Sequence, residues 1–242
     1  MRIFKFENID STNNFLKDLK DKENYDLAIA KFQTLGRGRR GNKWHSENGG
    51  AYFSFILKED KNISLEEYSK LSLVVGYSLL KTFEQLEPNL NFMFKWTNDI
   101  FVNDRKLSGI LIEKTGDNFV IGIGINLNNK INLELEKIAI SLKNITEKTY
   151  EINKFIYQIL ENFKKDLGFY LSGNFDIILR KLNSKNYLYN KKIIVELNKE
   201  NKIEGIAKQI EKTGELQIEI DGKIKRFNVG EIHILKKDLQ KS

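Results

Sequence analysis

The chain has 242 residues, of which 40% are hydrophobic and 30% are charged, a composition ordinary for a folded globular protein with one main core. It contains no cysteine and only the histidines His45 and His233, which excludes disulfides and cysteine chemistry and argues against a multi-histidine metal site or a serine–histidine–aspartate triad. The formal net charge of +7 favours anionic partners, although lysines spread along the chain also fit a merely solvated basic surface. Any catalysis must therefore use lysine, arginine, carboxylates and backbone amides.

The sequence carries no sign of a membrane-spanning or secretory segment. No run of residues approaches the roughly 18 consecutive apolar residues of a membrane helix. The N-terminal MRIFKFENIDSTN also lacks the apolar centre and the small-residue cleavage site of a signal peptide. We expect a cytoplasmic protein.

The first part of the chain is predicted to form a short helix and two strands. Ser11 and Thr12 are favourable N-cap residues ahead of an apolar helical pattern, so a short helix is expected to begin there. Strands are expected over residues 26–34 and 51–58, and they flank the basic loop GRGRRGNKW, residues 36–44. The residues expected on one face of the second strand are Ala51, Phe53, Phe55 and Leu57.

A long helix follows the second strand. Ser64 and Glu67 form a capping box, and Pro88, the only proline of the chain, marks the end. The spacing predicts one helix between them, with an inward stripe of Leu71, Val75, Leu79, Phe83 and Leu86.

Strands alternate with a second helical region in the rest of the chain. Residues 91–127 are predicted to form three consecutive strands, the first two separated by a polar turn at residues 103–105. Residues 150–172 are predicted to form a second long helix, and residues 175–182 continue in helical spacing. From about residue 191, short alternating segments with a hairpin signal at Asp221-Gly222 indicate a small barrel-like domain.

The third of these strands contains VIGIGIN, which has one bare face. In a strand, Gly122, Gly124 and Asn126 share the face opposite Ile121, Ile123 and Ile125. Interior glycines mark a close approach of a ligand or of another part of the protein, and both interpretations stay open for this segment. Asn126 favours a ligand slightly, because its amide can bind a polar edge such as that of a nucleobase.

A polar cluster is expected beside this strand. Lys95, Asn98 and Asp99 end one strand and Lys106 begins the next, so the turn between them can bring all four to one side of the sheet. The plain alternative is that Asp99 caps a turn and the lysines are solvated.

The loop at residues 36–44 carries Arg37, Arg39 and Arg40 among glycines. Arginine forks suit phosphate or carboxylate, and glycines allow close backbone approach. A loop pinned between two strands favours a phosphate-embracing segment over a nucleic-acid arm. It is neither a P-loop nor a dinucleotide fingerprint, because no Gly-Lys-Ser/Thr follows and the strand–turn–helix context is missing.

Taken together, these motifs resemble those of the biotin-protein ligase family in order and spacing over nearly the whole chain. The matching segments are Ser11–Asn13, Gln33–Gly41 followed by Trp44, Lys95–Asp99, Lys106–Glu113 and Gly122–Asn126. The tail is similar to the family's small SH3-like domain through Gly205, Gly214, Asp221-Gly222, Phe227 and Gly230-Glu231.

The resemblance implies an α+β fold. A mixed β-sheet with helices packed on it, the class II synthetase-like catalytic domain, would occupy residues 1–185, and an SH3-like β-barrel would occupy residues 190–242. Thr97 and Glu47 stand at turn-shaping positions where the family usually has proline. Some relatives carry an N-terminal winged-helix domain that binds DNA; here the ligase region begins close to the start of the chain, so we expect no operator binding.

The resemblance also implies a reaction and a set of site residues. Biotin and ATP would form biotinyl-5′-AMP, and a lysine of a biotin carboxyl carrier protein of a biotin-dependent carboxylase would then accept the biotin. Lys106 and Arg37 are the implied catalytic residues, and Mg²⁺ is expected with ATP, near Asp99 but without a direct protein cluster. The implied biotin-binding residues are Ser11, Thr12, Asn13, Gln33, Gly36, Arg37, Gly38, Arg39, Lys106, Gly109, Gly122 and Gly124. The implied adenylate-binding residues are Arg37, Arg39, Arg40, Trp44, Asn98, Asp99, Lys106 and Asn126.

Two other functions compete with this interpretation. A lipoate ligase shares the fold and the adenylate chemistry, and a basic nucleic-acid-binding protein would use the glycine–arginine loop without turning over a nucleotide. Whether the protein is a monomer or a homodimer stays open.

Overall fold

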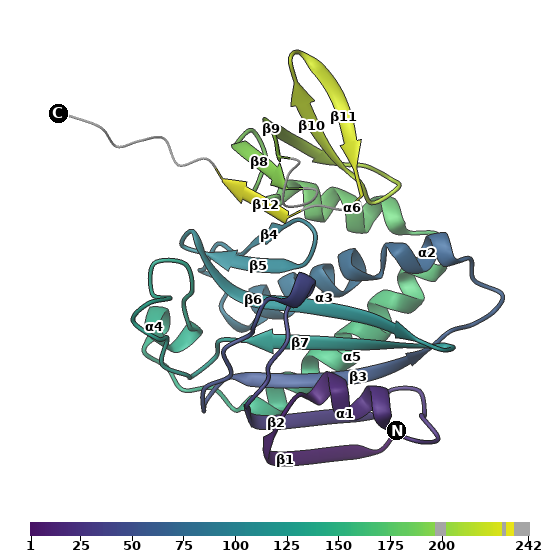
Figure 1. Cartoon of the computed structure of the whole chain (residues 1–242), viewed down its shortest axis with the longest axis vertical. Helices are drawn as coiled ribbons and strands as arrows, with labels where there is room; N and C mark the ends of the chain where they lie inside the picture. Colours follow the sequence, from purple (N-terminus) through teal and green to yellow (C-terminus); the bar gives the residue numbers. More distant parts are fainter. Residues whose placement is uncertain (197–201, 229–230, 235–242) are drawn as a thin grey trace.

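The computed structural model describes residues 1–196, 202–228 and 231–234 and contains two sheets. The larger sheet has seven strands in the order β1-β2-β3-β7-β6-β5-β4 (Figure 1). Only β1 and β2 pair in parallel, and every other neighbouring pair is antiparallel. The strands are β1 (Ile3–Ile9), β2 (Leu27–Gln33), β3 (Ala51–Lys58), β4 (Met93–Lys95), β5 (Asp99–Val102), β6 (Arg105–Thr115) and β7 (Asn118–Ile125).

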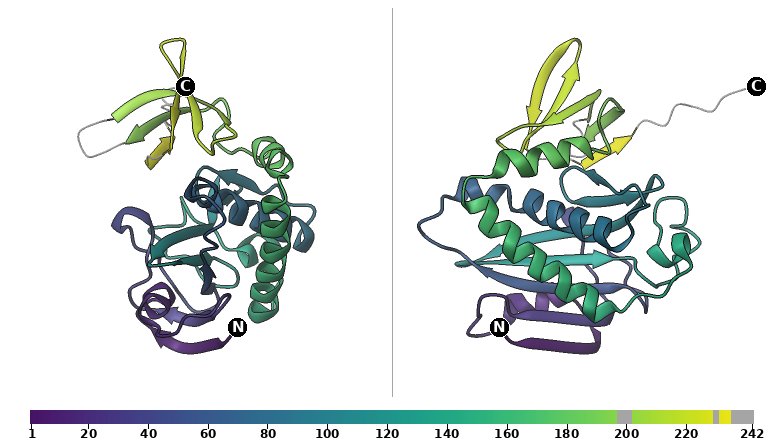
Figure 2. Two further views of the ribbon diagram at one scale, coloured as in Figure 1. Left: turned by 90° about the vertical axis from the view of Figure 1, so that its right-hand side faces the viewer. Right: turned by 180° about the vertical axis from the view of Figure 1, so that it is seen from behind.

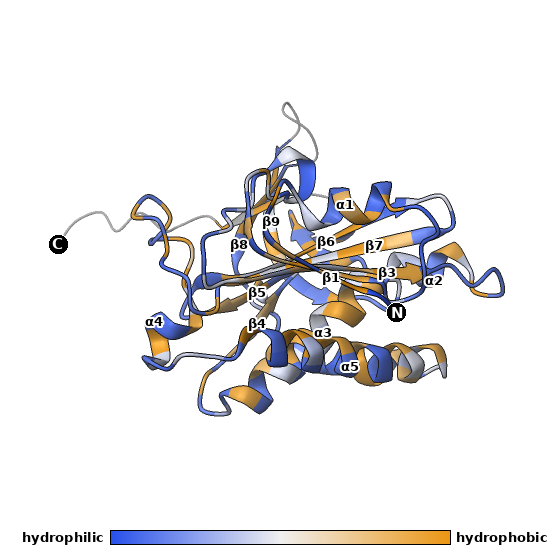
Figure 3. Cartoon of the chain, turned by 90° about the horizontal axis from the view of Figure 1, so that it is seen from below, coloured by the Kyte–Doolittle hydropathy of each residue, from blue (hydrophilic) through white to orange (hydrophobic). Residues whose placement is uncertain are grey.

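Helices cover both faces of this sheet, which gives three layers. The long helices α3 (Leu71–Leu86) and α5 (Ile152–Leu171) pack together on one face, and α1 (Thr12–Asp18) lies on the other (Figure 3). Burial against the long helices makes Ile121 and Ile123 of β7 part of the main core. The glycines of β7 therefore face the α1 side, where less of the sheet is covered by helix.

Strand β3 is buried on both faces, which its alternation did not predict. Phe53 and Phe55 lie in the main core as expected, but Tyr52 and Ser54 on the other face are also almost fully buried. The reason is that α1 and the loop after β2 cover that face. A pattern of apolar and polar residues therefore does not separate core from solvent in this strand.

The predicted long helix after Ser64 is wrong in one respect, because it is two helices. Ser64 caps α2 (Leu65–Ser69) by accepting a hydrogen bond from the backbone N–H of Glu67, as predicted. The chain then turns at Lys70, and α3 begins at Leu71. This turn lets Tyr68 stack on Phe119 of the sheet while α3 keeps its own apolar stripe against the core.

Three further elements differ from the sequence-based expectations. The edge strand β1 was not predicted, nor was the short helix α4 (Leu142–Thr146). The segment after α5 is a separate helix, α6 (Phe175–Ser184), because the chain reverses at Gly173 with a φ of 85°. No helix in the described ranges has the length and apolar character needed to cross a membrane.

The smaller sheet lies beyond the β4 edge of the larger one, with α6 next to it (Figures 1 and 2). Its strands are antiparallel in the order β11-β10-β9-β8-β12, and the predicted hairpin at Asp221-Gly222 joins β10 to β11. Within the described residues no pairing joins β11 to β12. The strands are β8 (Lys192–Glu196), β9 (Lys202–Ile210), β10 (Leu216–Ile220), β11 (Lys223–Phe227) and β12 (Glu231–Ile234).

A hydrogen bond of 2.9 Å from Trp96 Nε1 to the carbonyl of Gly214 connects the two sheets. The division into residues 1–185 and 190–242 stays a prediction, and residues 197–201, 229–230 and 235–242 of its second part lie outside the described residues. Gly230, expected in the motif of the tail, is among them.

Candidate ligand-binding cleft

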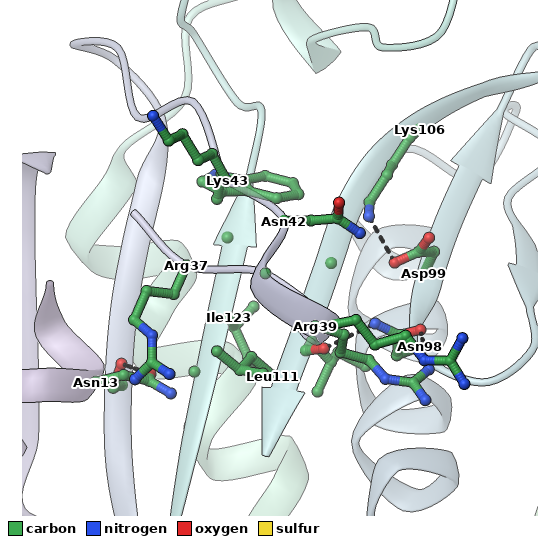
Figure 4. Close-up of a pocket in the computed structure, with 18 of the residues that line it drawn as sticks. Asn13, Arg37, Arg39, Asn42, Lys43, Asn98, Asp99, Lys106, Leu111 and Ile123 are labelled. Carbon is green, nitrogen blue, oxygen red and sulfur yellow. Dashed lines mark hydrogen bonds and ion pairs between the residues drawn. The ribbon is translucent and has the colours of Figure 1, made fainter. Parts of the chain in front are cut away.

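A cleft of about 220 Å³ opens on the α1 side of the larger sheet (Figure 4). Its floor is made by β3, β6 and β7, one wall by the start of α1, and the other wall by the end of β4 and the start of β5. The loop at residues 36–44, which we call the lid, crosses above the floor. Ile232 of β12 also lines the cleft, so both sheets contribute to it.

The glycines of β7 make the floor flat. A Cβ atom added at Gly122 would lie 2.0 Å from Asn13 Oδ1, and one at Gly124 would lie 2.5 Å from the indole of Trp44. Gly109 of β6 pairs with Gly124 and also lies under Trp44. Both interpretations of the bare face therefore hold in part: side chains from α1 and the lid approach it closely, and it borders the cleft.

A chain of hydrogen bonds fills the α1 end of the cleft. Gln33 Oε1 accepts from the backbone N–H of Thr12 at 2.9 Å and from its hydroxyl at 3.1 Å. The hydroxyls of Thr12 and Ser54 lie 2.7 Å apart, and Ser54 donates to Asn13 Oδ1 at 2.5 Å. Ser11 lies next to them as the N-cap of α1. These groups form a polar end of fixed geometry that can present donors and acceptors to a small polar ring.

The lid is folded back on itself and tied down by its arginines. The backbone N–H of Gly38 donates to the carbonyl of Asn42, and that of Trp44 donates to the carbonyl of Gly36. Each of the three arginines then reaches a different element. Arg37 binds Glu113 of β6, Arg39 donates to Asn98 Oδ1 at 3.0 Å, and Arg40 donates to the carbonyl of Glu196 in β8 at 2.9 Å.

The opposite end of the cleft holds an ion pair. Lys106 Nζ lies 2.8 Å from Asp99 Oδ1 and 5.3 Å from the centre of the Trp44 ring (Figure 4). Asn98 donates to the carbonyl of Ile110, which fixes its amide against β6. The prediction that Lys95, Asn98, Asp99 and Lys106 lie on one side of the sheet is confirmed, because all four line the cleft. The expected single strand before residue 103 is wrong, because the chain turns after Lys95 and forms the antiparallel pair β4 and β5.

Two predicted site residues do not line the cleft. Gly36 is buried at the base of the lid, where a Cβ would lie 2.3 Å from the carbonyl oxygen of Trp44. Asn126 is buried beyond the end of β7, and its side-chain oxygen accepts from Asn129 Nδ2 at 3.1 Å. The remaining predicted residues all line the cleft, while their roles toward a ligand stay predictions.

Sequence reasoning gave no role to four polar residues at the cleft. Asn42, Lys43 and Ser54 line it, and Glu113 binds the lid from just outside. Ser54 carried a signal, since it pairs with Gly122 in the adjacent strand and shares the face of the glycines. Glu113 and its partner Arg37 are 76 positions apart in the sequence, so no local sequence pattern could predict their contact.

The charge of the cleft is strongly positive. Its lining contains Arg37, Arg39, Arg40, Lys43, Lys95 and Lys106, and Asp99 is the one carboxylate among the described residues that line it. Several cationic side chains gathered around one cleft attract an anion such as a carboxylate or a phosphate. Among the described residues no group of three or more histidine, cysteine, aspartate or glutamate side chains could hold a metal ion.

A flat glycine floor, a polar end and a cationic lid on a mixed sheet form a cleft suited to an organic acid and to a phosphate group. The family model described as "Biotin/lipoate A/B protein ligase family" matches residues 5–128, and the model "Biotin protein ligase C terminal domain" matches residues 189–235. The chain belongs to the biotin/lipoate A/B protein ligase family.

Individual relatives agree with this assignment. The chain is 35% identical over 243 residues to the bifunctional ligase/repressor BirA of Escherichia coli, an alignment that covers 93% of this chain and 72% of the relative. It is 24% identical to the biotin–[acetyl-CoA-carboxylase] ligase of Mycobacterium tuberculosis, covering 85% of this chain and 77% of that one. The structure of the Aquifex aeolicus biotin protein ligase in complex with biotin and ATP superposes with a TM-score of 0.87 at 30% identity, covering 98% of this chain and 99% of that chain.

Proposed function

We propose that the protein is an ATP-dependent biotin–protein ligase that works in two half-reactions. In the first, a carboxylate oxygen of biotin bonds to the α-phosphorus of ATP, and the bond to the β-phosphate oxygen breaks, which gives biotinyl-5′-AMP and pyrophosphate. In the second, the amine of an acceptor lysine attacks the acyl carbon. A C–N bond forms, the bond from the acyl carbon to the phosphate oxygen breaks so that AMP leaves, and the amine nitrogen loses one proton to solvent.

One observation carries the proposal. The glycine floor leads from a polar end of buried hydrogen-bonding groups at Thr12 to a cationic end at Lys106, both beneath the arginine lid. Biotin has the same sequence of parts, namely a polar fused ring, an aliphatic chain and a carboxylate. The relatives named above include biotin ligases, and one of them is a complex with biotin and ATP.

In this proposal the polar end holds the ureido ring of biotin. Ser11, Thr12, Asn13 and Gln33 supply donors and acceptors there, and Gly122 lets the flat ring lie against the sheet. Gly109 would allow the same close approach along the valeryl chain once the Trp44 indole above it moves aside, and Gly38 lets the lid fold back onto Asn42. Gly36 serves indirectly, because its missing side chain lets Trp44 cross the base of the lid.

The cationic end performs the chemistry by position and charge. Two anions must meet in the first step, so fixed positive charge lowers the barrier more than any proton transfer does. Lys106 and Arg37 would hold the biotin carboxylate against the α-phosphate, with Arg39 and Arg40 on the remaining phosphates. Trp44 would stack on adenine and Asn98 would orient a phosphate. The proposed contact of Asn126 with the adenine edge requires a movement, because Asn126 lies outside the cleft lining.

Magnesium fits this site only as a partner of the nucleotide. Mg²⁺ binds proteins through one or two carboxylates together with substrate phosphates, and Asp99 is the carboxylate that the described lining offers. Asp99 would hold such an ion, which would supply charge neutralisation on the phosphates. Within the protein itself, Asp99 orients Lys106 through their ion pair.

The acceptor in this proposal is the biotin carboxyl carrier protein of a biotin-dependent carboxylase. Its support is the name of the Mycobacterium tuberculosis relative, a biotin–[acetyl-CoA-carboxylase] ligase. The open side of the cleft would admit a lysine side chain to the acyl carbon while the lid keeps bulk water from the anhydride.

The test is exchange of labelled pyrophosphate into ATP in the presence of biotin or of lipoate. Biotin should support exchange and lipoate should not, because lipoate has no ureido group to bind the polar end. Transfer of labelled biotin to a purified carrier protein then tests the second half-reaction. Exchange with lipoate alone would make the protein a lipoate ligase, and salt-dependent nucleic-acid binding without exchange would point to the basic loop instead.

A further inference from the structure

Glu113 near the end of β6 is the meeting point of three elements. Its carboxylate forms a two-pronged ion pair with Arg37 of the lid, with Nη2 3.0 Å from Oε1 and Nη1 3.1 Å from Oε2. Lys17 of α1 lies 3.2 Å from Oε1, and Asn13 donates to Oε2 at 3.0 Å. The side chain of Glu113 is 19% exposed, and Glu113 does not line the cleft.

Both terminal nitrogens of Arg37 are engaged in this arrangement. A guanidinium group binds a carboxylate or a phosphate through two parallel N–H groups, and Glu113 accepts from both terminal nitrogens while Asn14 Oδ1 also accepts from Nη1 at 2.9 Å. Arg37 therefore cannot bind Glu113 and a ligand anion in the same way at the same time. Figure 4 shows its head group beside Asn13, at the α1 end of the cleft and away from Lys106.

We propose that Glu113 is a positioning residue that holds the lid down on the ligand-free cleft through Arg37, and that the anionic group of the ligand takes Arg37 from it. The proposal rests on the proposed function, in which that anion is the carboxylate of biotin or a phosphate of ATP. Glu113 then acts as an internal competitor of the substrate for one guanidinium group.

Lys17 lowers the free-energy cost of moving Arg37 from Glu113 to a ligand. A partly buried carboxylate left without any cationic partner would be destabilised by its desolvation. Lys17 and Asn13 prevent this, because they stay with Glu113 when Arg37 leaves. Burial alone would raise the pKa of Glu113, yet the hydrogen bonds from Asn13 and Lys17 and the charge of Arg37 outweigh it and hold the pKa below its usual range. The carboxylate is therefore charged in both arrangements.

The same carboxylate links the lid to the polar end of the cleft. The amide of Asn13 is held between Ser54, which donates to its oxygen, and Glu113, which accepts from its nitrogen. Asn13 in turn covers Gly122 on the floor. Release of Arg37 thus changes the charge around the group that meets the polar ring of the ligand.

The test compares Glu113→Gln with the wild type. Glutamine keeps the size and an acceptor for Asn13 but removes the charge that holds Arg37. In the ligand-free protein, amide hydrogen exchange in residues 37–44 should become faster by about fivefold, the scale of one partly exposed ion pair. In pyrophosphate exchange, the KM for biotin or for ATP should fall by a few-fold while kcat stays within about twofold.

Two further variants separate this role from simple structural support. Lys17→Gln should act in the opposite direction, with slower lid exchange and a higher KM, because Glu113 keeps only Arg37 as a cation. Glu59→Gln is the matched control, since Glu59 pairs with Lys114 on the same strand at 2.7 Å and is 14% exposed but does not contact the lid. Glu59→Gln should change neither the amide exchange rate of the lid nor the KM.

Unchanged lid exchange in Glu113→Gln, or a fall in kcat with a raised KM, would overturn the proposal. If Glu113→Gln fails to fold, Lys17→Gln is the remaining test. Unchanged or faster amide exchange of the lid in Lys17→Gln would contradict the proposal that Glu113 holds the lid. Failure of the proposed function gives a different result. The wild type would then show no biotin-dependent pyrophosphate exchange, while ligand-free lid exchange would still report whether Glu113 holds Arg37.

Discussion

Lys106 Nζ lies 2.8 Å from Asp99 Oδ1, across a pair of adjacent antiparallel strands and directly beneath the lid. The pair keeps the ammonium group in a fixed place at the cationic end of the cleft. A preorganised charge of this kind stabilises a transition state without the cost of reorganising solvent.

Replacement of this ammonium group should therefore stop adenylate formation. We expect Lys106→Ala to reduce the rate of biotin-dependent pyrophosphate exchange by about a hundredfold or more, the scale for the loss of one preorganised electrostatic contact. Lys114→Ala on the same strand is the control, because Lys114 pairs with Glu59 away from the cleft. Near-normal exchange in Lys106→Ala would remove Lys106 from the catalytic role.

The indole of Trp44 should contribute mainly to ATP binding. It lies over Gly124 and Gly109 and within 5.3 Å of Lys106, so a nucleobase that stacks on it would sit next to the phosphate site. Stacking of a base on an aromatic ring is worth about 1–3 kcal/mol, so Trp44→Ala should raise the KM for ATP by roughly 5- to 150-fold. Trp44→Phe should be intermediate. An unchanged KM for ATP with a raised KM for biotin would contradict this assignment.

The lid should become more ordered when substrates bind. Like charges repel within it, and its arginines are held apart on separate elements, Arg39 at the turn between β4 and β5 and Arg40 at β8. Biotin and ATP together would add anions on which all three arginines converge. Amide hydrogen exchange in residues 36–45 should therefore slow on their addition, while residues 152–171 of α5 serve as an internal reference. Unchanged exchange in the lid would argue against closure.

Much of this site could be predicted from the sequence where the pattern was local. The period of two in VIGIGIN located the glycine floor, and the short turn at residues 103–105 brought Asp99 and Lys106 together. Contacts between distant segments could not be predicted in this way. Glu113 meets Asn13 and Arg37 only because β6 and α1 share one end of the folded sheet.

The errors in the predicted fold have similar physical causes. The segment from Ser64 to Leu86 contains no proline, yet the chain turns at Lys70. Tyr68 ahead of the turn stacks on Phe119 of the sheet. Strand β1 lies at an edge of the sheet, and none of its residues is fully buried, so it has no continuous buried apolar face. Tertiary packing determines such helix boundaries and edge strands, and local secondary-structure propensity contains no information about that packing.

The glycine floor should not tolerate a methyl group. A Cβ at Gly122 would lie 2.0 Å from Asn13 Oδ1, and Asn13 is held by Ser54 and Glu113, so it cannot simply move aside. Gly122→Ala should weaken biotin binding by tenfold or more, measured by isothermal titration. Gly168→Ala in α5 is the matched control, because no atom lies within 4 Å of the added methyl group. It should leave binding unchanged and raise the free energy of unfolding by up to about 1 kcal/mol. Normal biotin affinity in Gly122→Ala would mean that the ring does not lie on this floor.

Acid stability should depend on the fully buried carboxylate of Asp26. It accepts hydrogen bonds from the backbone N–H of Arg2 at 2.8 Å, from the Arg2 guanidinium at 2.5 Å and from the backbone N–H of Glu23 at 2.9 Å. Burial alone would raise the pKa of Asp26, but these hydrogen bonds outweigh it and lower the pKa. The stabilisation is therefore present above the unfolded-state pKa, near about 4, and is lost as the pH falls through the lower folded-state value.

Asp26→Asn should accordingly lower the free energy of unfolding at pH 7 by about 2 kcal/mol, the scale for hydrogen bonds to a buried charge. The difference from the wild type should stay constant down to about pH 5 and shrink below it, because the wild type then loses the same charge. Urea denaturation from pH 7 to pH 3 measures this directly. Asp176→Asn is the control, since Asp176 is 61% exposed in its pair with Lys212 and such pairs contribute at most about 1 kcal/mol. A difference for Asp26→Asn that grows as the pH falls would show that the pKa shift has the opposite sign.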